Sequence, residues 1–125
     1  IGFPFDPLCG PERVAHVMRE IPNLHFIAAH LGGWRQWGGA IEQLLGKDIY
    51  LDTAVLEPHV GDADPLRLLR EHPADKLLFA TDWPWLGFAK GTRFVRSAGL
   101  SPETERAILG GNAAKLLGIT SPASW

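Results

Sequence analysis

Residues 76–85, with the sequence KLLFATDWPW, decide how the rest of the chain is interpreted. An apolar run leads into Asp82 and is stopped directly afterwards by Trp83 and Pro84. This pattern is typical of a buried strand whose last residue emerges at the edge of a sheet. Because α/β proteins keep their chemistry at the ends of strands, we expect Asp82 to belong to a functional site.

Two other apolar runs have the same character. We predict strands over 24–29, ending at His30, over 49–54 and over 77–82, each nearly continuously apolar rather than alternating. Helical spacing and capping residues predict helices over 11–21, 37–45, 64–72, 92–98 and 101–109, with a last turn over 112–118. This order is typical of parallel strands covered by helices. The fold class is therefore α/β, built from βα units of a barrel or of a doubly wound sheet.

Composition excludes several classes of protein. Of the 125 residues, 46% are hydrophobic, and no apolar run approaches the roughly 18 residues of a membrane span. The net charge of −2, without a basic cluster, argues against nucleic acid as a partner. Cys9 is the only cysteine, so no intrachain disulfide can form, and we expect a cytoplasmic protein.

The chain is long enough for one domain with its own core. We predict a single domain over 1–119, followed by a C-terminal tail over 120–125. The chain begins at Ile1, in the loop-like sequence IGFPFDP, and not with methionine. From this beginning we expect a fragment of a larger protein.

Parallel order places the carboxyl ends of all the predicted strands on the same side. His30, Asp52 with Thr53, and Asp82 then share one rim of the sheet. Other titratable residues, His25, Asp48 and Asp75, fall near the starts of strands. In barrels that opposite side contributes stability and not catalysis.

Each residue of the rim allows a functional and a structural interpretation. His30 is a candidate metal ligand or general base, or else a core histidine that is hydrogen-bonded to backbone. Asp82 is a candidate metal ligand that accepts a proton from water, or else a helix cap or a salt-bridge partner. Asp52 is a candidate substrate contact, although an Asp-Thr pair at a strand end also caps loops readily.

Two further residues are candidates for contact with a substrate. His59 lies in a loop on the same rim, where plain surface is the alternative. Trp83 could form the wall of a pocket, but large aromatic residues belong to the core more often. His16 and His72 lie in predicted helices, where we expect them to be solvated.

Four segments together resemble a known family: PNLHFIAAHLGG over 22–33, YLDT over 50–53, LFATDWP over 78–84 and ILGGNAAKLL over 108–117. In this order and spacing they resemble the C-terminal part of amidohydrolase-related metal-dependent hydrolases. This branch of the amidohydrolase superfamily includes aminocarboxymuconate semialdehyde decarboxylase. The resemblance covers residues 11–119.

The resemblance implies a distorted TIM (β/α)8 barrel, of which this chain supplies strands six to eight. It also implies that Asp82 is the eighth-strand aspartate that binds a catalytic divalent metal, usually zinc. His30 is then the sixth-strand histidine beside the metal, as a ligand or as a base. The family's first-strand His-x-His pair and its fifth-strand histidine have no counterpart here. Since zinc sites take three or more protein ligands, we expect the chain alone to bind metal weakly and to be catalytically incomplete.

These features predict part of a hydrolase or decarboxylase that acts on a small carboxylated or cyclic substrate through metal-activated water. Two unpaired sheet edges would favour a homo-oligomer, or pairing with a missing N-terminal segment. One alternative is a small non-catalytic α/β module for protein interaction or self-association. Another is a doubly wound sheet that binds phosphate at Gly32-Gly33. Against it, the sequence contains neither G-x-G-x-x-G nor the spacing of a P-loop.

Overall fold

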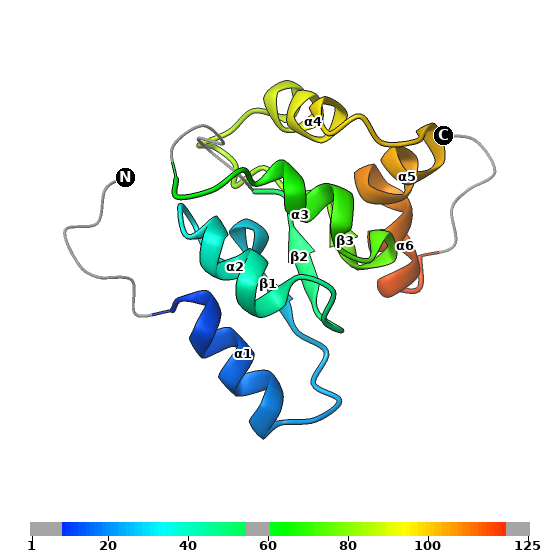
Figure 1. The fold of residues 1–125 in the computed structure, drawn as a ribbon. Coiled ribbons are helices and arrows are strands. Elements are labelled where there is room, and N and C mark those ends of the chain that lie inside the picture. Colours follow the sequence, from blue (N-terminus) through cyan, green and yellow to red (C-terminus); the bar gives the residue numbers. More distant parts are fainter. Residues whose placement is uncertain (1–8, 55–60, 120–125) are drawn as a thin grey trace.

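A three-stranded parallel sheet forms the centre of the computed structural model, which describes residues 9–54 and 61–119. The strands lie in the order β1-β2-β3 and comprise β1 (Ile27–Ala28), β2 (Tyr50–Asp52) and β3 (Leu77–Leu78) (Figure 1). Ile27 is aligned with Tyr50, and Leu51 with Leu77. The predicted parallel arrangement is confirmed, so the carboxyl ends of the strands lie on one side.

The strands are shorter than predicted because other groups take over the hydrogen bonds of the ladder. Beyond β1, His30 and Leu31 adopt left-handed conformations with φ of 55° and 53°, which turns the chain away. Beyond β3, the N–H of Ala80 donates to Thr53 Oγ1, at 3.1 Å, and not to a backbone carbonyl. The predicted strands are therefore present as short ladders that continue into irregular segments.

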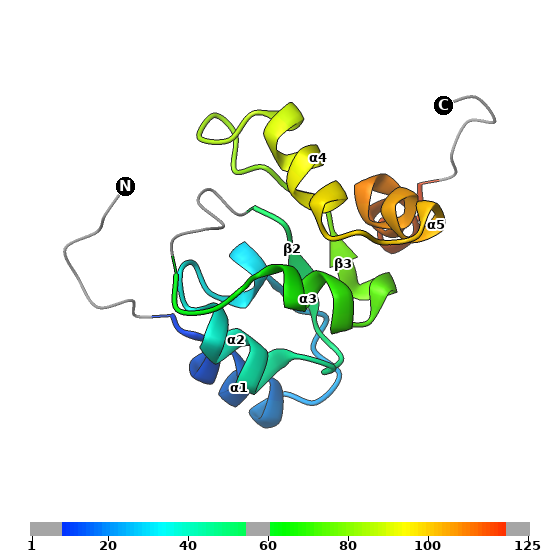
Figure 2. The ribbon, with the colours of Figure 1, turned by 45° about the horizontal axis from the view of Figure 1, so that its top comes forward.

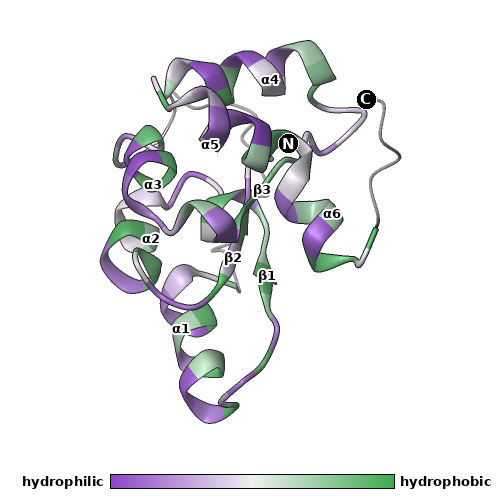
Figure 3. Ribbon diagram, turned by 90° about the vertical axis from the view of Figure 1, so that its right-hand side faces the viewer, coloured by the Kyte–Doolittle hydropathy of each residue, from purple (hydrophilic) through white to green (hydrophobic). Residues whose placement is uncertain are grey.

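Three helices cover one side of the sheet. α1 (Pro11–Glu20), α2 (Trp37–Leu44) and α3 (Leu66–Glu71) lie on the same side of the strands (Figures 1 and 3). α1 packs along α2, and α4 (Phe88–Ser97) lies at the opposite end of the molecule (Figure 2). The architecture is therefore α/β, with a small parallel sheet and helices packed against it.

The C-terminal helices form one nearly continuous rod. α5 (Pro102–Arg106) and α6 (Asn112–Leu116) are joined by a π-helical turn over Ala107–Gly111. The side chain of Ser101 accepts the N–H of Thr104 and caps α5, as the sequence predicts. No helix in the described part of the chain is long and apolar enough to cross a membrane.

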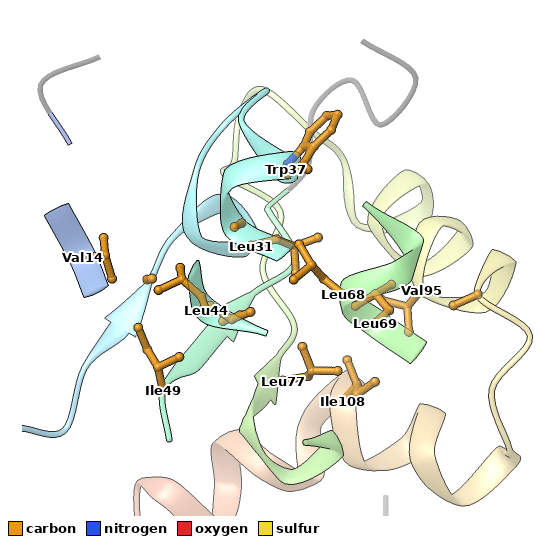
Figure 4. Close-up of a cluster of buried hydrophobic side chains, with 14 of the residues drawn as sticks. Val14, Leu31, Trp37, Leu44, Ile49, Leu68, Leu69, Leu77, Val95 and Ile108 are labelled. Carbon is orange, nitrogen blue, oxygen red and sulfur yellow. The ribbon is translucent and has the colours of Figure 1, made fainter. Parts of the chain in front are cut away.

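The core lies between the sheet and the helices. Its largest fully buried side chains come from several elements, and include Leu31, Trp37, Leu44, Ile49, Leu68, Leu77, Val95 and Ile108 (Figure 4). Along β1 the burial alternates, since Ala28 is buried and the side chain of Ile27 is 51% exposed. β1 thus buries one face and leaves part of the other exposed, whereas both residues of β3 are buried.

The outer edge of β3 is closed by the C-terminal rod. Phe79 donates its N–H to the carbonyl of Ile108 at 3.1 Å, and Asn112 Nδ2 donates to the carbonyl of Leu77 at 2.8 Å. Asn112 Nδ2 also donates to the carbonyl of Ala74 at 2.7 Å. The prediction of two unpaired sheet edges is therefore wrong for β3, while β1 is the other edge strand.

His72 is another correction. It is only 4% exposed, whereas a solvated helical residue was predicted. The ring follows the last residue of α3 and turns inward, where Nε2 donates to the carbonyl of Ile49 at 2.9 Å and Nδ1 accepts the N–H of Gly46 at 3.3 Å. Burial lowers the pKa of His72. The residue joins the end of α3 to the start of β2.

Candidate functional site

Three polar residues follow the three strands on the same side of the sheet. His30 comes two residues after β1, Asp52 ends β2, and Asp82 comes four residues after β3. Because neighbouring strands lie about 4.8 Å apart, β1 and β3 are separated by about 10 Å across β2. Side chains from the two outer strands can therefore approach a common ligand.

His30 is half-buried and held at two points. Its backbone N–H donates to Asp52 Oδ1 at 2.9 Å, and its ring nitrogen Nδ1 lies 2.6 Å from the carbonyl oxygen of Ala54. A carbonyl oxygen only accepts hydrogen bonds, so Nδ1 carries the hydrogen. In the neutral ring Nε2 then presents a lone pair, as a metal ligand or a general base requires. Hydrogen bonding to backbone and availability for chemistry are thus compatible in this residue.

Asp52 holds the loops that leave β1 and β2. Its Oδ1 accepts the N–H of His30 and, at 3.0 Å, the N–H of Ala54. This is the loop-capping behaviour that was weighed against contact with a substrate. The next residue, Thr53, is fully buried and donates through Oγ1 to the carbonyl of Ala80 at 3.2 Å. Thr53 thereby connects β2 to the segment that carries Asp82.

Asp82 presents its carboxylate to solvent. It adopts a left-handed conformation with φ of 56°, and its carbonyl accepts the N–H of Trp85 at 2.9 Å in a tight turn. Within residues 9–54 and 61–119 the carboxylate takes part in no hydrogen bond or ion pair, and the N-cap position of α4 is occupied by Gly87. The alternatives of helix cap and salt bridge are therefore not realised among the described residues.

An exposed aromatic group adjoins Asp82. The Trp83 side chain is 70% exposed and stacks on Phe88, with ring centroids 6.4 Å apart and ring planes inclined by 20°. Trp85 is 60% exposed, so neither tryptophan belongs to the core of this chain. The other predicted substrate contact, His59, lies outside the described residues. His16 is exposed on α1, as predicted.

A cavity of about 360 Å³ lies beside His30 along β1, lined in part by Ala29, Gly32, Gly33 and Trp34. Gly32 has a φ of +90°, and a Cβ there would lie 2.4 Å from a methyl group of Leu44. A Cβ on Gly33 would lie 2.9 Å from the ring of Pro11. Backbone conformation and close packing therefore explain both glycines, which removes the main support for a phosphate site.

The described residues fit only part of a metal site. Imidazole nitrogen and carboxylate oxygen are suitable zinc donors, and His30 and Asp82 offer one of each. In the part of the chain that the structure describes, no group of three or more His, Cys, Asp or Glu residues could hold a metal ion. Structural and catalytic zinc sites take three or four protein ligands. These two donors would need others to complete a zinc site.

Two residues of the site could not be found from the sequence. Ala54 contributes only its backbone carbonyl, which orients the ring of His30, and no side-chain signal marks such a role. Phe88 forms the stacked pair with Trp83 from the first residue of α4. Phe88 lies five residues after Trp83, and no standard sequence motif predicts contact between aromatic residues at this spacing.

Comparison with known proteins identifies the family. The family model for amidohydrolases matches residues 2–119, which is nearly the whole chain. Neither the curated proteins nor the solved structures gave a match. The match agrees with the α/β fold and its small parallel sheet. The chain belongs to the amidohydrolase family.

Proposed function

We propose that this chain forms part of the active site of a metal-dependent hydrolase or decarboxylase. The observation that carries the proposal is the free Nε2 of His30 on the same side of the sheet as the exposed carboxylate of Asp82. In this proposal β1, β2 and β3 are strands six to eight of a TIM (β/α)8 barrel. The enzyme belongs to the branch that includes aminocarboxymuconate semialdehyde decarboxylase and acts in the cytoplasm.

The two residues have different roles in the reaction. A divalent metal, for which we propose zinc, supplies a Lewis acid that lowers the pKa of water toward about 7 when it is bound. Asp82 is a metal ligand and accepts a proton from the attacking water. His30 is the second donor, or it moves a proton through Nε2 between water and substrate, since imidazole exchanges protons near neutral pH.

The substrate in this proposal is small and carboxylated or cyclic. The exposed face of Trp83, stacked on Phe88 next to Asp82, offers a flat apolar surface to a ring. We also propose that Asp52 and His59 contact the substrate. For Asp52 this contact would use Oδ2, since Oδ1 already accepts two backbone N–H groups.

The remaining metal donors come, in this proposal, from polypeptide outside this chain. Two donors among the described residues are fewer than the three that zinc takes in catalytic sites. The donors belong either to a preceding N-terminal segment or to another copy. By itself the chain is then inactive and binds zinc weakly.

Calorimetric titration of the chain with zinc tests the proposal. We expect weak binding that is lost in both the Asp82→Asn and His30→Ala variants. The matched controls His25→Ala and Asp48→Asn change the same residue types at the opposite end of the sheet and should bind as the wild type does. Tight stoichiometric binding by the chain alone would show that the site is complete. Binding that survives both site substitutions would place the metal elsewhere.

A second candidate is a non-catalytic module that associates through β1. The observation in its favour is that apolar side chains are exposed in β1 and in the segment that leads into it, since Ile21, Leu24 and Ile27 are 52%, 38% and 51% exposed. Sedimentation of the wild type and of Ile27→Lys tests this candidate. A wild-type oligomer that Ile27→Lys converts into a monomer would support it, and a wild-type monomer at high concentration would contradict it.

A further inference from the structure

A closed set of hydrogen bonds joins Asp52 to the ring of His30. Asp52 Oδ1 accepts the backbone N–H of His30 at 2.9 Å and the backbone N–H of Ala54 at 3.0 Å. The carbonyl of Ala54 in turn accepts the ring N–H of His30 at 2.6 Å. Asp52 Oδ1 therefore binds the backbone of His30 and of Ala54, the two residues that are joined by the ring hydrogen bond.

This third bond selects one form of the imidazole ring. A neutral histidine carries its hydrogen on Nδ1 or on Nε2, and the hydrogen bond made by one nitrogen decides which form is present. Free neutral histidine in water prefers the Nε2–H form. The carbonyl of Ala54 requires the opposite form, with the hydrogen on Nδ1 and the lone pair on Nε2.

The backbone at His30 also requires support. His30 and Leu31 have φ values of 55° and 53°, a left-handed conformation that residues with a Cβ atom adopt only at a cost in free energy. Hydrogen bonds from backbone N–H groups to an ionised carboxylate are stronger than those between neutral groups. Asp52 accepts such bonds from the backbone N–H groups of His30 and Ala54, and these bonds offset the cost of the left-handed conformation.

We propose that Asp52 is a positioning residue that fixes the tautomer of His30. Through the backbone of Ala54 it keeps the hydrogen of the His30 ring on Nδ1 and leaves Nε2 as the nitrogen available for chemistry. The use of Nε2 by metal or substrate rests on the proposed function. The selection of the tautomer rests only on the hydrogen bonds among His30, Asp52 and Ala54.

Nuclear magnetic resonance of the chain with isotope-labelled histidine tests the proposal, because the nitrogen shifts of the ring distinguish the two neutral forms. At about pH 8.5, where a histidine is neutral, we expect wild-type His30 in the Nδ1–H form. In Asp52→Ala the signals of this form should be lost in favour of Nε2–H. Asp52→Asn should retain the wild-type form, because its amide oxygen can accept the same two N–H groups.

Asp62→Ala is the matched control, since Asp62 Oδ1 also accepts a backbone N–H, that of Gly38 at 2.8 Å, away from His30. It should leave the His30 signals unchanged. A wild-type ring in the Nε2–H form overturns the proposal without any variant, so the test survives if Asp52→Ala does not fold. An unchanged tautomer in folded Asp52→Ala also overturns it.

Adding zinc to the same samples separates this proposal from the proposed function. If Asp52→Ala changes the tautomer but zinc does not shift wild-type Nε2, the positioning role stands and the metal-site proposal fails. If zinc shifts Nε2 equally in the wild type and in Asp52→Ala, with no change of tautomer, the metal-site proposal stands. The positioning role then fails.

Discussion

The two ends of the parallel sheet use their polar residues in different ways. At the amino end, Lys76 Nζ lies 2.7 Å from Asp48 Oδ1 and 4.4 Å from the centre of the Tyr50 ring. The hydrogen bond with Asp48 raises the pKa of Lys76, and the same bond lowers the pKa of Asp48. Both nitrogens of the His72 ring are hydrogen-bonded there as well. These polar groups have partners within the chain.

At the carboxyl end, groups of His30 and Asp82 remain for a ligand among the described residues. Nε2 of His30 has its lone pair available because Nδ1 donates to Ala54, and the carboxylate of Asp82 is exposed. Both residues adopt left-handed backbone conformations, with φ of 55° and 56°. In barrels the amino end serves stability and the carboxyl end serves chemistry. The difference predicts that substitutions at the amino end lower stability, whereas Asp82 can be replaced without such a loss.

The largest expected effect is at the amino end, in Asn112→Ala. The side chain of Asn112 is buried and donates to the carbonyls of Ala74 and Leu77. Its removal takes the donor from the carbonyl of the buried Leu77 and from the carbonyl of Ala74, which should lower the free energy of unfolding by about 2–3 kcal/mol in urea titrations. Lys115→Ala, an exposed change in the same helix, should have little effect. A similar stability for the two variants would contradict the stabilising role of the hydrogen bonds made by Asn112.

The next effect is a dependence of stability on pH that comes from His72. Burial lowers its pKa below the ordinary value of 6.5, so below pH 6.5 the unfolded state binds more protons than the folded state. Stability is therefore fully present above pH 6.5 and is lost as the pH falls toward the lowered pKa, by at most about 1.4 kcal/mol per pH unit.

Urea titrations at several pH values measure this dependence. The slope below the ordinary pKa should be smaller in His72→Gln than in the wild type. The control His16→Gln changes an exposed histidine on α1 and should retain the wild-type slope. Equal slopes in the wild type and in His72→Gln would show that His72 does not cause the dependence.

A smaller effect, of opposite sign, is expected at the carboxyl end for Asp82→Gly. A left-handed conformation costs a residue with Cβ about 1–2 kcal/mol, while glycine adopts it freely but loses more entropy on folding. The net gain in the free energy of unfolding should be below about 1 kcal/mol. Asp75→Gly, in the 3-10 turn directly before β3, removes an aspartate without positive φ and should destabilise the protein. A marked loss of stability in Asp82→Gly would show that the carboxylate has a structural role.

The smallest effect is expected for Asp48→Asn. The Asp48 side chain is 86% exposed, and water screens its interaction with Lys76. Thermal unfolding should show a small decrease in melting temperature at low salt, and none at about 1 M salt, where the Debye length is about 3 Å. A decrease that persists at high salt would contradict this account of the ion pair.

The sequence was sufficient for the direction of the strands and for the rim that they share. Nearly continuous apolar runs indicate parallel strands, and polarity then puts His30 and Asp82 on one side. The capping role of Asp52 was also among the interpretations that the Asp-Thr pair allowed. These inferences succeed because the apolar residues of a strand and the direction of the chain leave their pattern in consecutive residues.

Other features depend on backbone atoms that are distant in sequence. The ring of His72 points inward because it donates to the carbonyl of Ile49. The edge of β3 is closed because the carbonyl of Ile108 accepts the N–H of Phe79. The tautomer of His30 depends on the carbonyl of Ala54. Every residue has a carbonyl, so no residue type marks these partners. They become visible only when the segments are placed in three dimensions.

Paramagnetic broadening by Mn²⁺ tests the central claim most directly, because this ion binds carboxylate and imidazole donors and weakens nearby amide signals. The account predicts that the signals around His30 and Asp82, at the carboxyl end of the sheet, lose intensity at the lowest Mn²⁺ concentrations. Broadening that begins around His25 and Asp48, at the amino end, would contradict the assignment of the metal-binding residues to the carboxyl end.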